Sequence, residues 1–388
     1  MLHRLANLNP DIQRLLEKGY AISFDSNFLV IRDIPYLDDN KNLKFGAIVS
    51  NLVFVNNDHV RINDHQIFFC GSHPCELDGS LIKNLGGGQT TLALKSPDLV
   101  VQRSFSNRPI TGAFANLVDK IDSYVTLFSG PAMELYKDVT PYSFNSYEDH
   151  TDSVFKFNDT LTSRAAIGDL ASKLSDDVIA IIGLGGTGAY ILDFLVKTPV
   201  KEIRGFDLDW YHVHNSYRSP GKLDSEELGK KKAEVYQKRY ESFRSGINLN
   251  SKYIQVDSDE DLAGVTFAFV CVDKGSSRSG IFDLLIRLKI PFIDVGMGLK
   301  RDKGAIDGMM RVTYYSPDLA EELLTKGLAP MHDEPDDIYK NNIQISELNA
   351  LNACFAVMRY KQIRGFYEEE NSIHHMLFTT QDFHNVGE

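Results

Sequence analysis

A glycine-rich segment near the middle of the chain has the residue types that bind phosphate. Residues 181–188 read Ile-Ile-Gly-Leu-Gly-Gly-Thr-Gly, after an apolar stretch that predicts a strand and at the start of a stretch that predicts a helix. Glycines there let backbone N–H groups approach phosphate oxygens at the positive end of the helix. We therefore expect Gly183, Gly185, Gly186 and Gly188 to bind a nucleotide. Taken alone, this loop favours NAD or FAD over ATP, because proteins that use those cofactors are common.

Acidic and basic residues follow the next predicted strand, 202–206. Asp207 and Asp209 come directly after it, and a carboxylate at this point can accept hydrogen bonds from ribose hydroxyls in binders of either NAD or ATP. Asn215 and Arg218 come shortly afterwards. Hydride transfer does not need an Asn and an Arg beside the phosphates, whereas charge that develops on a transferred phosphate does need them.

Further residues at fixed spacings complete a series of motifs. The series resembles the ThiF/MoeB family, the adenylation domains of ubiquitin-activating enzymes. That family has Gly-x-Gly-Gly-x-Gly, Asp-x-Asp, Asn-x-x-Arg, Gly-x-x-Lys and Asp-x-x-x-x-Arg, and then a Pro that opens a further strand. After the glycine loop, the matching residues here are Asp207, Asn215, Arg218, Gly229, Lys232, Asp273, Arg278 and Pro291.

The resemblance implies a role for each matching position. Asp207 would hold the ribose of ATP, with Asp209 beside it in the nucleotide site, and Asp273 would hold Mg²⁺ near the α-phosphate. The residues that would contact the phosphates are Asn215, Arg218 and Lys232. A carboxylate of the substrate would attack the α-phosphorus, and pyrophosphate would leave. Because that nucleophile is already an anion at neutral pH, no general base is needed.

The same family has an arginine shortly before its first strand, and this arginine reaches the ATP of the partner subunit. Arg164 stands at that place. If it acts in trans, the resemblance implies a homodimer with Arg164 among the catalytic residues. The alternative interpretation of Arg164 is a solvated arginine on a helix surface.

The chain has four cysteines, Cys70, Cys75, Cys271 and Cys354. They are too few and too scattered for a disulfide framework, which predicts a reducing, cytoplasmic compartment. Many relatives hold zinc with two Cys-x-x-Cys pairs; these pairs are absent, so we expect no structural zinc. Cys75 stays open as a thioester site. The thioester step, if there is one, is otherwise expected elsewhere.

The composition predicts a globular protein of two domains. The chain has 388 residues, of which 43% are hydrophobic and 24% charged, and its formal net charge is −12. Because phosphate affinity comes from clustered Lys and Arg, this balance argues against a nucleic-acid partner. Residues 1–8 lack the pattern of a signal peptide, and we expect no membrane span.

The pattern of apolar residues divides the chain at about residue 150. Residues 1–150 predict an α+β docking domain for a partner or substrate, with a helix at 10–18, strands at 21–24, 28–31, 45–55 and 66–69, and a helix at 112–128. Residues 151–388 predict a doubly wound, Rossmann-like α/β domain with a mostly parallel sheet. Its expected strands are 178–182, 202–206, 267–272 and 291–295, and its expected helices are 187–197, 230–244 and 277–288.

The residues also resemble a bacterial group of ThiF-type proteins that carry an uncharacterised N-terminal domain, in segments 105–109, 273–275 and 341–367. From this we expect a homodimeric enzyme that adenylates the C-terminal carboxylate of a ubiquitin-like protein with Mg²⁺ and ATP, with a conjugating enzyme as a further candidate partner. One alternative is adenylation of a short peptide, as in microcin-type maturation. More distant alternatives are a NAD-dependent oxidoreductase and a nucleotide-binding scaffold without turnover.

Overall fold

The computed structural model of the protein describes residues 9–25, 27–56, 59–62, 64–145, 153–157, 159, 161–162, 165, 167–301, 304–332, 343–382 and 384–387. The chain divides into two compact units, Met1–Ile167 and Gly168–Glu388. We call these unit 1 and unit 2. The boundary at residue 150, drawn from composition, stays a prediction.

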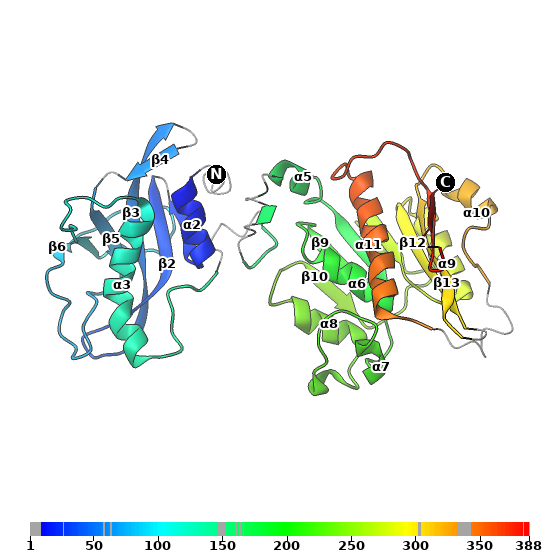
Figure 1. The fold of residues 1–388 in the computed structure, drawn as a ribbon, viewed down its shortest axis with the longest axis horizontal. Coiled ribbons are helices and arrows are strands. Elements are labelled where there is room, and N and C mark those ends of the chain that lie inside the picture. Colours follow the sequence, from blue (N-terminus) through cyan, green and yellow to red (C-terminus); the bar gives the residue numbers. More distant parts are fainter. Residues whose placement is uncertain are drawn as a thin grey trace. The chain divides into compact units, whose positions relative to one another are not determined.

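Unit 1 is built on an antiparallel sheet (Figure 1). The strand order is β1-β2-β3-β5-β7-β6, and β4 pairs with β3. The strands are β1 (Ala21–Asp25), β2 (Phe28–Leu37), β3 (Leu43–Asn56), β4 (His59–Ile62), β5 (Gln66–Cys70), β6 (Gly86–Gln89) and β7 (Arg103–Ser106). Helices α2 (Pro10–Lys18) and α3 (Leu117–Leu135) contribute to a core that they share with the sheet. The predicted α+β class is confirmed.

Helix α3 starts and ends later than the predicted helix at 112–128. Asn116 caps it, because the Asn116 side chain accepts a hydrogen bond from the backbone N–H of Asp119. The helix then continues through Pro131 to Leu135. The apolar face explains the extension: Phe128 and Ala132 are both buried, so burial beyond the proline stabilises a turn that Gly130 and Pro131 disfavour locally.

Unit 2 contains an eight-stranded sheet with the order β10-β9-β8-β11-β12-β13-β14-β15. Its strands are β8 (Val178–Ile182), β9 (Glu202–Phe206), β10 (Ile247–Asn250), β11 (Phe267–Val270), β12 (Phe292–Lys300), β13 (Asp307–Tyr315), β14 (His375–Thr379) and β15 (His384–Gly387). The strands from β10 to β12 are parallel. The remaining pairs, from β12 to β15, are antiparallel. The sequence predicted four of the parallel strands, β8, β9, β11 and β12, and missed β10; β8 and β9 have the predicted bounds.

Helices cover both faces of this sheet, as a doubly wound fold requires. One apolar core lies between the sheet and α6 (Gly186–Leu195), α8 (Lys232–Tyr240) and α11 (Ser346–Ile363). A second core includes α9 (Gly275–Arg287) and α10 (Ala320–Thr325). The other named helices of unit 2 are α5 (Gly168–Ser172) and α7 (Val213–Ser216). In the described part of the chain, none of the helices has the length and apolar character that crossing a membrane requires.

Candidate functional site

The carboxyl ends of the parallel strands bring the predicted residues of unit 2 to one edge of the sheet. The glycine loop follows β8, Asp207 follows β9, and Asp273 follows β11. These strands are neighbours in the order β9-β8-β11. We call this the carboxyl edge. Figure 1 shows α6 and α8 beside these strands.

The glycine loop is packed so tightly that two of its glycines have no room for a side chain. A Cβ on Gly188 would lie 1.9 Å from the carbonyl oxygen of Gly183, and Gly183 itself has a φ of +97°. A Cβ on Gly186 would lie 2.3 Å from the Asn349 amide nitrogen. Gly185 differs, because a Cβ there would meet nothing within 4 Å. Gly185 therefore borders open space at the N-terminus of α6, where a phosphate could lie.

Asp207 fixes the loop to the second strand. Its buried carboxylate accepts hydrogen bonds from the backbone N–H of Leu184 and of Asp209, each at 2.8 Å. The Lys232 ammonium lies 3.3 Å from one of its oxygens. Because Asp207 is 6% exposed and has three donors, it stabilises the loop and neutralises part of the charge on Lys232.

Asp209 is a carboxylate that the carboxyl edge presents to solvent. Its side chain is 56% exposed, and it accepts hydrogen bonds from Lys232 Nζ at 2.8 Å and from the Tyr253 hydroxyl at 3.1 Å. Burial alone would raise the pKa of Asp209, but the hydrogen bond and charge of Lys232 outweigh it, and the pKa is lowered. Asp209 is thus an anion with lone pairs open to a ligand.

Lys232 is held at the start of α8 by the loop before it. The predicted helix at 230–244 begins later, at Lys232, because the preceding backbone pairs elsewhere: Lys230 accepts a hydrogen bond from the backbone N–H of Tyr211, and Trp210 pairs with Lys231 as a bridge. The Lys232 N–H donates to the Asp209 carbonyl at 3.0 Å. Lys232 is 5% exposed, so its ammonium is a fixed charge at this edge.

Asn215 and Arg218 lie in and after the short helix α7. The buried Asn215 amide oxygen accepts a hydrogen bond from the backbone N–H of His212 at 2.7 Å, which caps the helix. Arg218 is half-buried, and its Nε has no hydrogen-bond partner among the residues that the structure describes. A buried guanidinium nitrogen without a partner is unusual. It leaves the Arg218 fork available to an anion.

Asn349, on α11, belongs to the same cluster, although its sequence context did not mark it. Its amide oxygen accepts a hydrogen bond from the Thr187 hydroxyl at 2.9 Å, and its amide nitrogen donates to the Arg218 carbonyl at 3.3 Å. Asn349 therefore joins the N-terminus of α6 to Arg218. The signal in the sequence is weak: Asn349 and Asn352 are polar residues in an otherwise apolar helical run.

Asp273 is exposed at the carboxyl edge, in the loop between β11 and α9. Arg278 positions this loop, because its buried guanidinium donates hydrogen bonds to the Val272 carbonyl and to Asp294. Arg278 is thus a structural residue in its motif. Within the described residues, no group of three or more His, Cys, Asp or Glu could hold a metal ion by itself. A single carboxylate still suits Mg²⁺, which takes its remaining ligands from phosphate and water.

The other candidate residues do not join this cluster. Arg164 lies outside the described residues. Cys75 is buried, its thiol donates a hydrogen bond to the His73 carbonyl, and burial raises the pKa of the thiol. Burial also raises the pKa of Cys70 to about 11 and that of Cys271 still further. A thioester nucleophile needs a lowered pKa and access to solvent, and these thiols have the opposite character.

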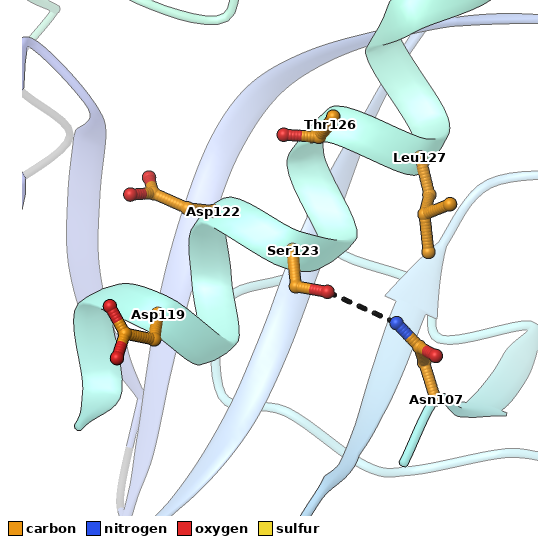
Figure 2. Close-up of a pocket in the computed structure, with 6 residues that line it drawn as sticks. All are labelled: Asn107, Asp119, Asp122, Ser123, Thr126 and Leu127. Carbon is orange, nitrogen blue, oxygen red and sulfur yellow. Dashed lines mark hydrogen bonds between the residues drawn. The ribbon is translucent and has the colours of Figure 1, made fainter. Parts of the chain in front are cut away.

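Unit 1 has a shallow hollow on α3, with a volume of about 440 Å³ (Figure 2). It is lined by Asn107, Asp119, Asp122, Ser123, Thr126 and Leu127. Its polar groups already have partners: Ser123 accepts a hydrogen bond from Asn107, and Asp122 pairs with Lys18 and with the Tyr20 hydroxyl. The carboxyl edge of unit 2, with its available guanidinium and carboxylate, is the better candidate for chemistry.

Comparison with protein families assigns each part of the chain. Residues 158–327 match the ThiF family, and residues 10–160 match a family described as "Domain of unknown function (DUF6791)". The curated tRNA threonylcarbamoyladenosine dehydratase of Haemophilus influenzae is 24% identical over 132 residues, which are 33% of this chain and 50% of that protein. The chain therefore spans about half the length of the curated relative that it matches. The expected ThiF-type domain and the uncharacterised N-terminal domain are both confirmed.

Three solved structures illustrate the similarity of fold. PaaA has a TM-score of 0.44 and 17% identity, and the match covers 57% of this chain and 75% of PaaA. MccB of E. coli with ATP has a TM-score of 0.41 and 16% identity, covering 58% and 66%. The dehydratase TcdA of E. coli in complex with AMP has a TM-score of 0.41 and 17% identity, covering 53% and 92%. The assignment of the domain rests on the family match and not on these structures.

Proposed function

We propose, from the premise that residues 158–327 form a ThiF family domain, that this protein uses ATP to adenylate a carboxylate and releases pyrophosphate. The observation that carries the proposal is the link from the glycine loop through Asn349 to Arg218. It supports an arginine with a partnerless, buried Nε beside the phosphate-binding end of α6. Hydride transfer does not need an arginine beside the phosphates at the glycine loop, whereas transfer of an adenylyl group does.

In this proposal the residues at the carboxyl edge have distinct tasks. The N–H groups at the start of α6 bind phosphate oxygens, and Gly185 leaves room for them. Arg218 and Lys232 stabilise the charge that grows on the α-phosphate as the substrate carboxylate attacks, and Asn215 lies beside them. Asp207 and Asp209 stand at the ribose position. Asp273 would hold Mg²⁺, which supplies further positive charge at the phosphates when it is bound.

The acceptor that we propose is the C-terminal carboxylate of a ubiquitin-like protein, and the enzyme would work as a homodimer in the cytoplasm with Arg164 reaching the partner's site. Unit 1 would dock the acceptor or a conjugating enzyme. A carboxylate at the end of an extended tail fits the requirement, because it is an anion and needs no base. A short peptide would meet the same requirement and is the second outcome that the experiment distinguishes.

The test is ATP–pyrophosphate exchange with the purified chain, with and without candidate acceptors that end in Gly-Gly and with short peptides. We expect exchange that requires an acceptor and falls at least about 100-fold in Asp273→Ala, since removal of one group that stabilises the transition state typically costs about 10²–10³ in rate. Asp283→Ala, which removes an exposed carboxylate from α9, is the matched control and should exchange like the unaltered chain.

The other outcomes separate the alternatives. ATP binding without exchange for any acceptor would contradict adenylation and favour a nucleotide-binding scaffold. Binding of NAD in place of ATP would favour an oxidoreductase. Exchange that depends on a short peptide, but not on a folded protein, would retain adenylation and replace the proposed acceptor.

A further inference from the structure

Tyr253 is an exposed aromatic residue whose hydroxyl belongs to the carboxyl edge. Its side chain is 58% exposed, and its hydroxyl donates a hydrogen bond to the solvent-facing carboxylate of Asp209 at 3.1 Å. Burial, and then the negative charge of Asp209, raises the pKa of this hydroxyl, to which Asp207 and Asp273 also contribute. Tyr253 therefore stays protonated as a donor at neutral pH and lies within electrostatic range of all three carboxylates.

The loop that carries Tyr253 is well fixed. It follows β10, and the backbone N–H of Lys252 donates to the Asn250 carbonyl at 2.9 Å. The next residue, Ile254, is buried in the core that α9 covers. Further along, Gln255 and Ser258 exchange two hydrogen bonds. The ring of Tyr253 is therefore fixed at both ends, by this backbone and by Asp209, and it is mostly open to solvent. It is a preformed surface for a ligand.

The strand order shows what this surface would face. Phosphates bind at the glycine loop after β8, and ribose hydroxyls bind at acids after the neighbouring strand β9. The nucleobase is attached to the far side of the ribose from the phosphates, so it must extend past β9. The next strand in the sheet order β10-β9-β8 is β10, which is also the edge strand (Figure 1). Tyr253 stands just beyond the carboxyl end of that strand.

We propose that Tyr253 forms the wall on which the nucleobase of ATP stacks, while its hydroxyl holds Asp209 in place for the ribose. This inference rests on the proposed function, because it takes the nucleotide to lie along β8, β9 and β10. Stacking of a base on an aromatic side chain tolerates any base. Tyr253 would therefore supply affinity for the nucleoside part of the ligand, and the phosphate contacts would be independent of it.

The chain contains a built-in probe for this test. Its single tryptophan, Trp210, directly follows Asp209 and is 51% exposed. Titration of its fluorescence with ATP–Mg²⁺, and separately with inorganic triphosphate, measures binding without any need for turnover. The variants are Tyr253→Ala, which removes ring and hydroxyl, and Tyr253→Phe, which keeps the ring. Tyr367→Ala is the matched control, because it removes an exposed tyrosine beyond the distant C-terminal end of α11.

We expect Tyr253→Ala to weaken ATP binding about 5- to 150-fold, the range for loss of one base-stacking side chain. Tyr253→Phe should stay within about threefold of the unaltered chain, since the ring is retained. Triphosphate should bind alike to all variants. A melting temperature for each variant separates lost binding from lost folding, and because Tyr253 is 58% exposed we expect Tyr253→Ala to fold like the unaltered chain.

Two results would overturn the inference while the proposed function stands: unchanged ATP affinity in Tyr253→Ala, or equal losses for ATP and triphosphate in that variant. If the unaltered chain binds ATP through Tyr253 but never exchanges pyrophosphate, adenylation fails and the base-stacking wall remains. If the unaltered chain does not bind ATP at all, both proposals fall.

Discussion

The two units differ in where the strand ends of their sheets place polar side chains. In unit 1 the sheet is antiparallel, so strand ends of both polarities alternate along each edge. Its buried Lys120 donates a hydrogen bond to the Ser50 hydroxyl at 3.1 Å and lies 3.6 Å from Asp64. In unit 2 the carboxyl ends of five neighbouring parallel strands lie at one edge, and Arg218 has a buried Nε without a partner among the described residues.

The difference teaches where chemistry can accumulate. A parallel sheet collects loops from strands that are far apart in sequence at one edge, and helices on both faces then bury and orient the polar residues of those loops. The antiparallel sheet of unit 1 does not collect its polar groups at one edge: Lys120 pairs with Ser50 and Asp64, and the buried Arg103 Nε, which has no hydrogen-bond partner among the described residues, lies elsewhere in the unit. At the carboxyl edge, unit 2 leaves both donors and acceptors open to a ligand. The open donors suit a bound anion. Four substitutions test whether this contrast is real.

The largest effect should come from the buried charge cluster that supports the Asp273 loop. Asp294 is fully buried and pairs with both Arg278 and Arg311. Asp294→Asn would leave two guanidinium groups without their counter-charge, and we expect the free energy of unfolding to fall by about 3–5 kcal/mol. Denaturant titration measures it, with Asp259→Asn as the control.

Asp259 pairs with Arg287 at a distance of 2.8 Å, but both side chains are exposed. Screening by water makes such a pair worth at most about 1 kcal/mol. Equal destabilisation by the two substitutions would mean that the cluster around Asp294 does not support unit 2 in the way that its burial indicates.

The second effect separates stability from binding within the glycine loop. Gly188→Ala would place a Cβ 1.9 Å from a backbone carbonyl, so we expect a loss of about 1–3 kcal/mol of stability or more. Gly185→Ala has free space in the protein and a φ of −74° that alanine adopts readily, so its stability should hold.

ATP affinity should single out the other variant of the two, Gly185→Ala, whose stability is unchanged. If phosphate occupies the space beside Gly185, Gly185→Ala weakens ATP affinity although the protein remains as stable as before. Calorimetric titration with ATP, alongside thermal melts, gives both quantities. A Gly185→Ala protein that binds ATP normally would show that the open space at the start of α6 does not hold the nucleotide.

The sequence predicted the local parts of this arrangement and missed the long-range ones. Strands β8 and β9 could be located to the residue, because β8 is a short apolar run that ends directly before Gly183 and β9 is a short segment that ends in Phe206 directly before Asp207. Asn349 could not be assigned a role, since its partner Thr187 is 162 residues away. Tyr253 gave no signal for the same reason: its partner Asp209 is 44 residues away along the chain, after the neighbouring strand β9.

The same reasoning explains why the antiparallel half of the sheet in unit 2 went unpredicted. Strand β13 pairs with β12 on one side and with β14 on the other. The segment that joins β13 to β14 along the chain includes both α10 and α11. No periodicity in a single segment reveals a partner at that distance, so only assembly of the whole unit defines the pair of β13 and β14.

The smallest effect tests whether unit 1 truly satisfies its buried charge. Burial lowers the pKa of Lys120, and Asp64 only partly offsets this. Replacing a buried ionised side chain by an apolar one of similar size is often neutral, so Lys120→Met should change stability at pH 7 by no more than about 1 kcal/mol. The pH dependence is more informative. Between the lowered native pKa and the unfolded value of about 10.4, the unfolded chain binds the extra proton.

The stability of the unaltered chain should therefore rise with pH in that window relative to Lys120→Met, whose residue 120 cannot titrate. Denaturant unfolding followed by far-UV circular dichroism at several pH values from about 7 to about 10 gives this difference, and other groups that titrate cancel because both proteins contain them. A difference that stays constant with pH would show that Lys120 is as well solvated in the fold as in the unfolded chain.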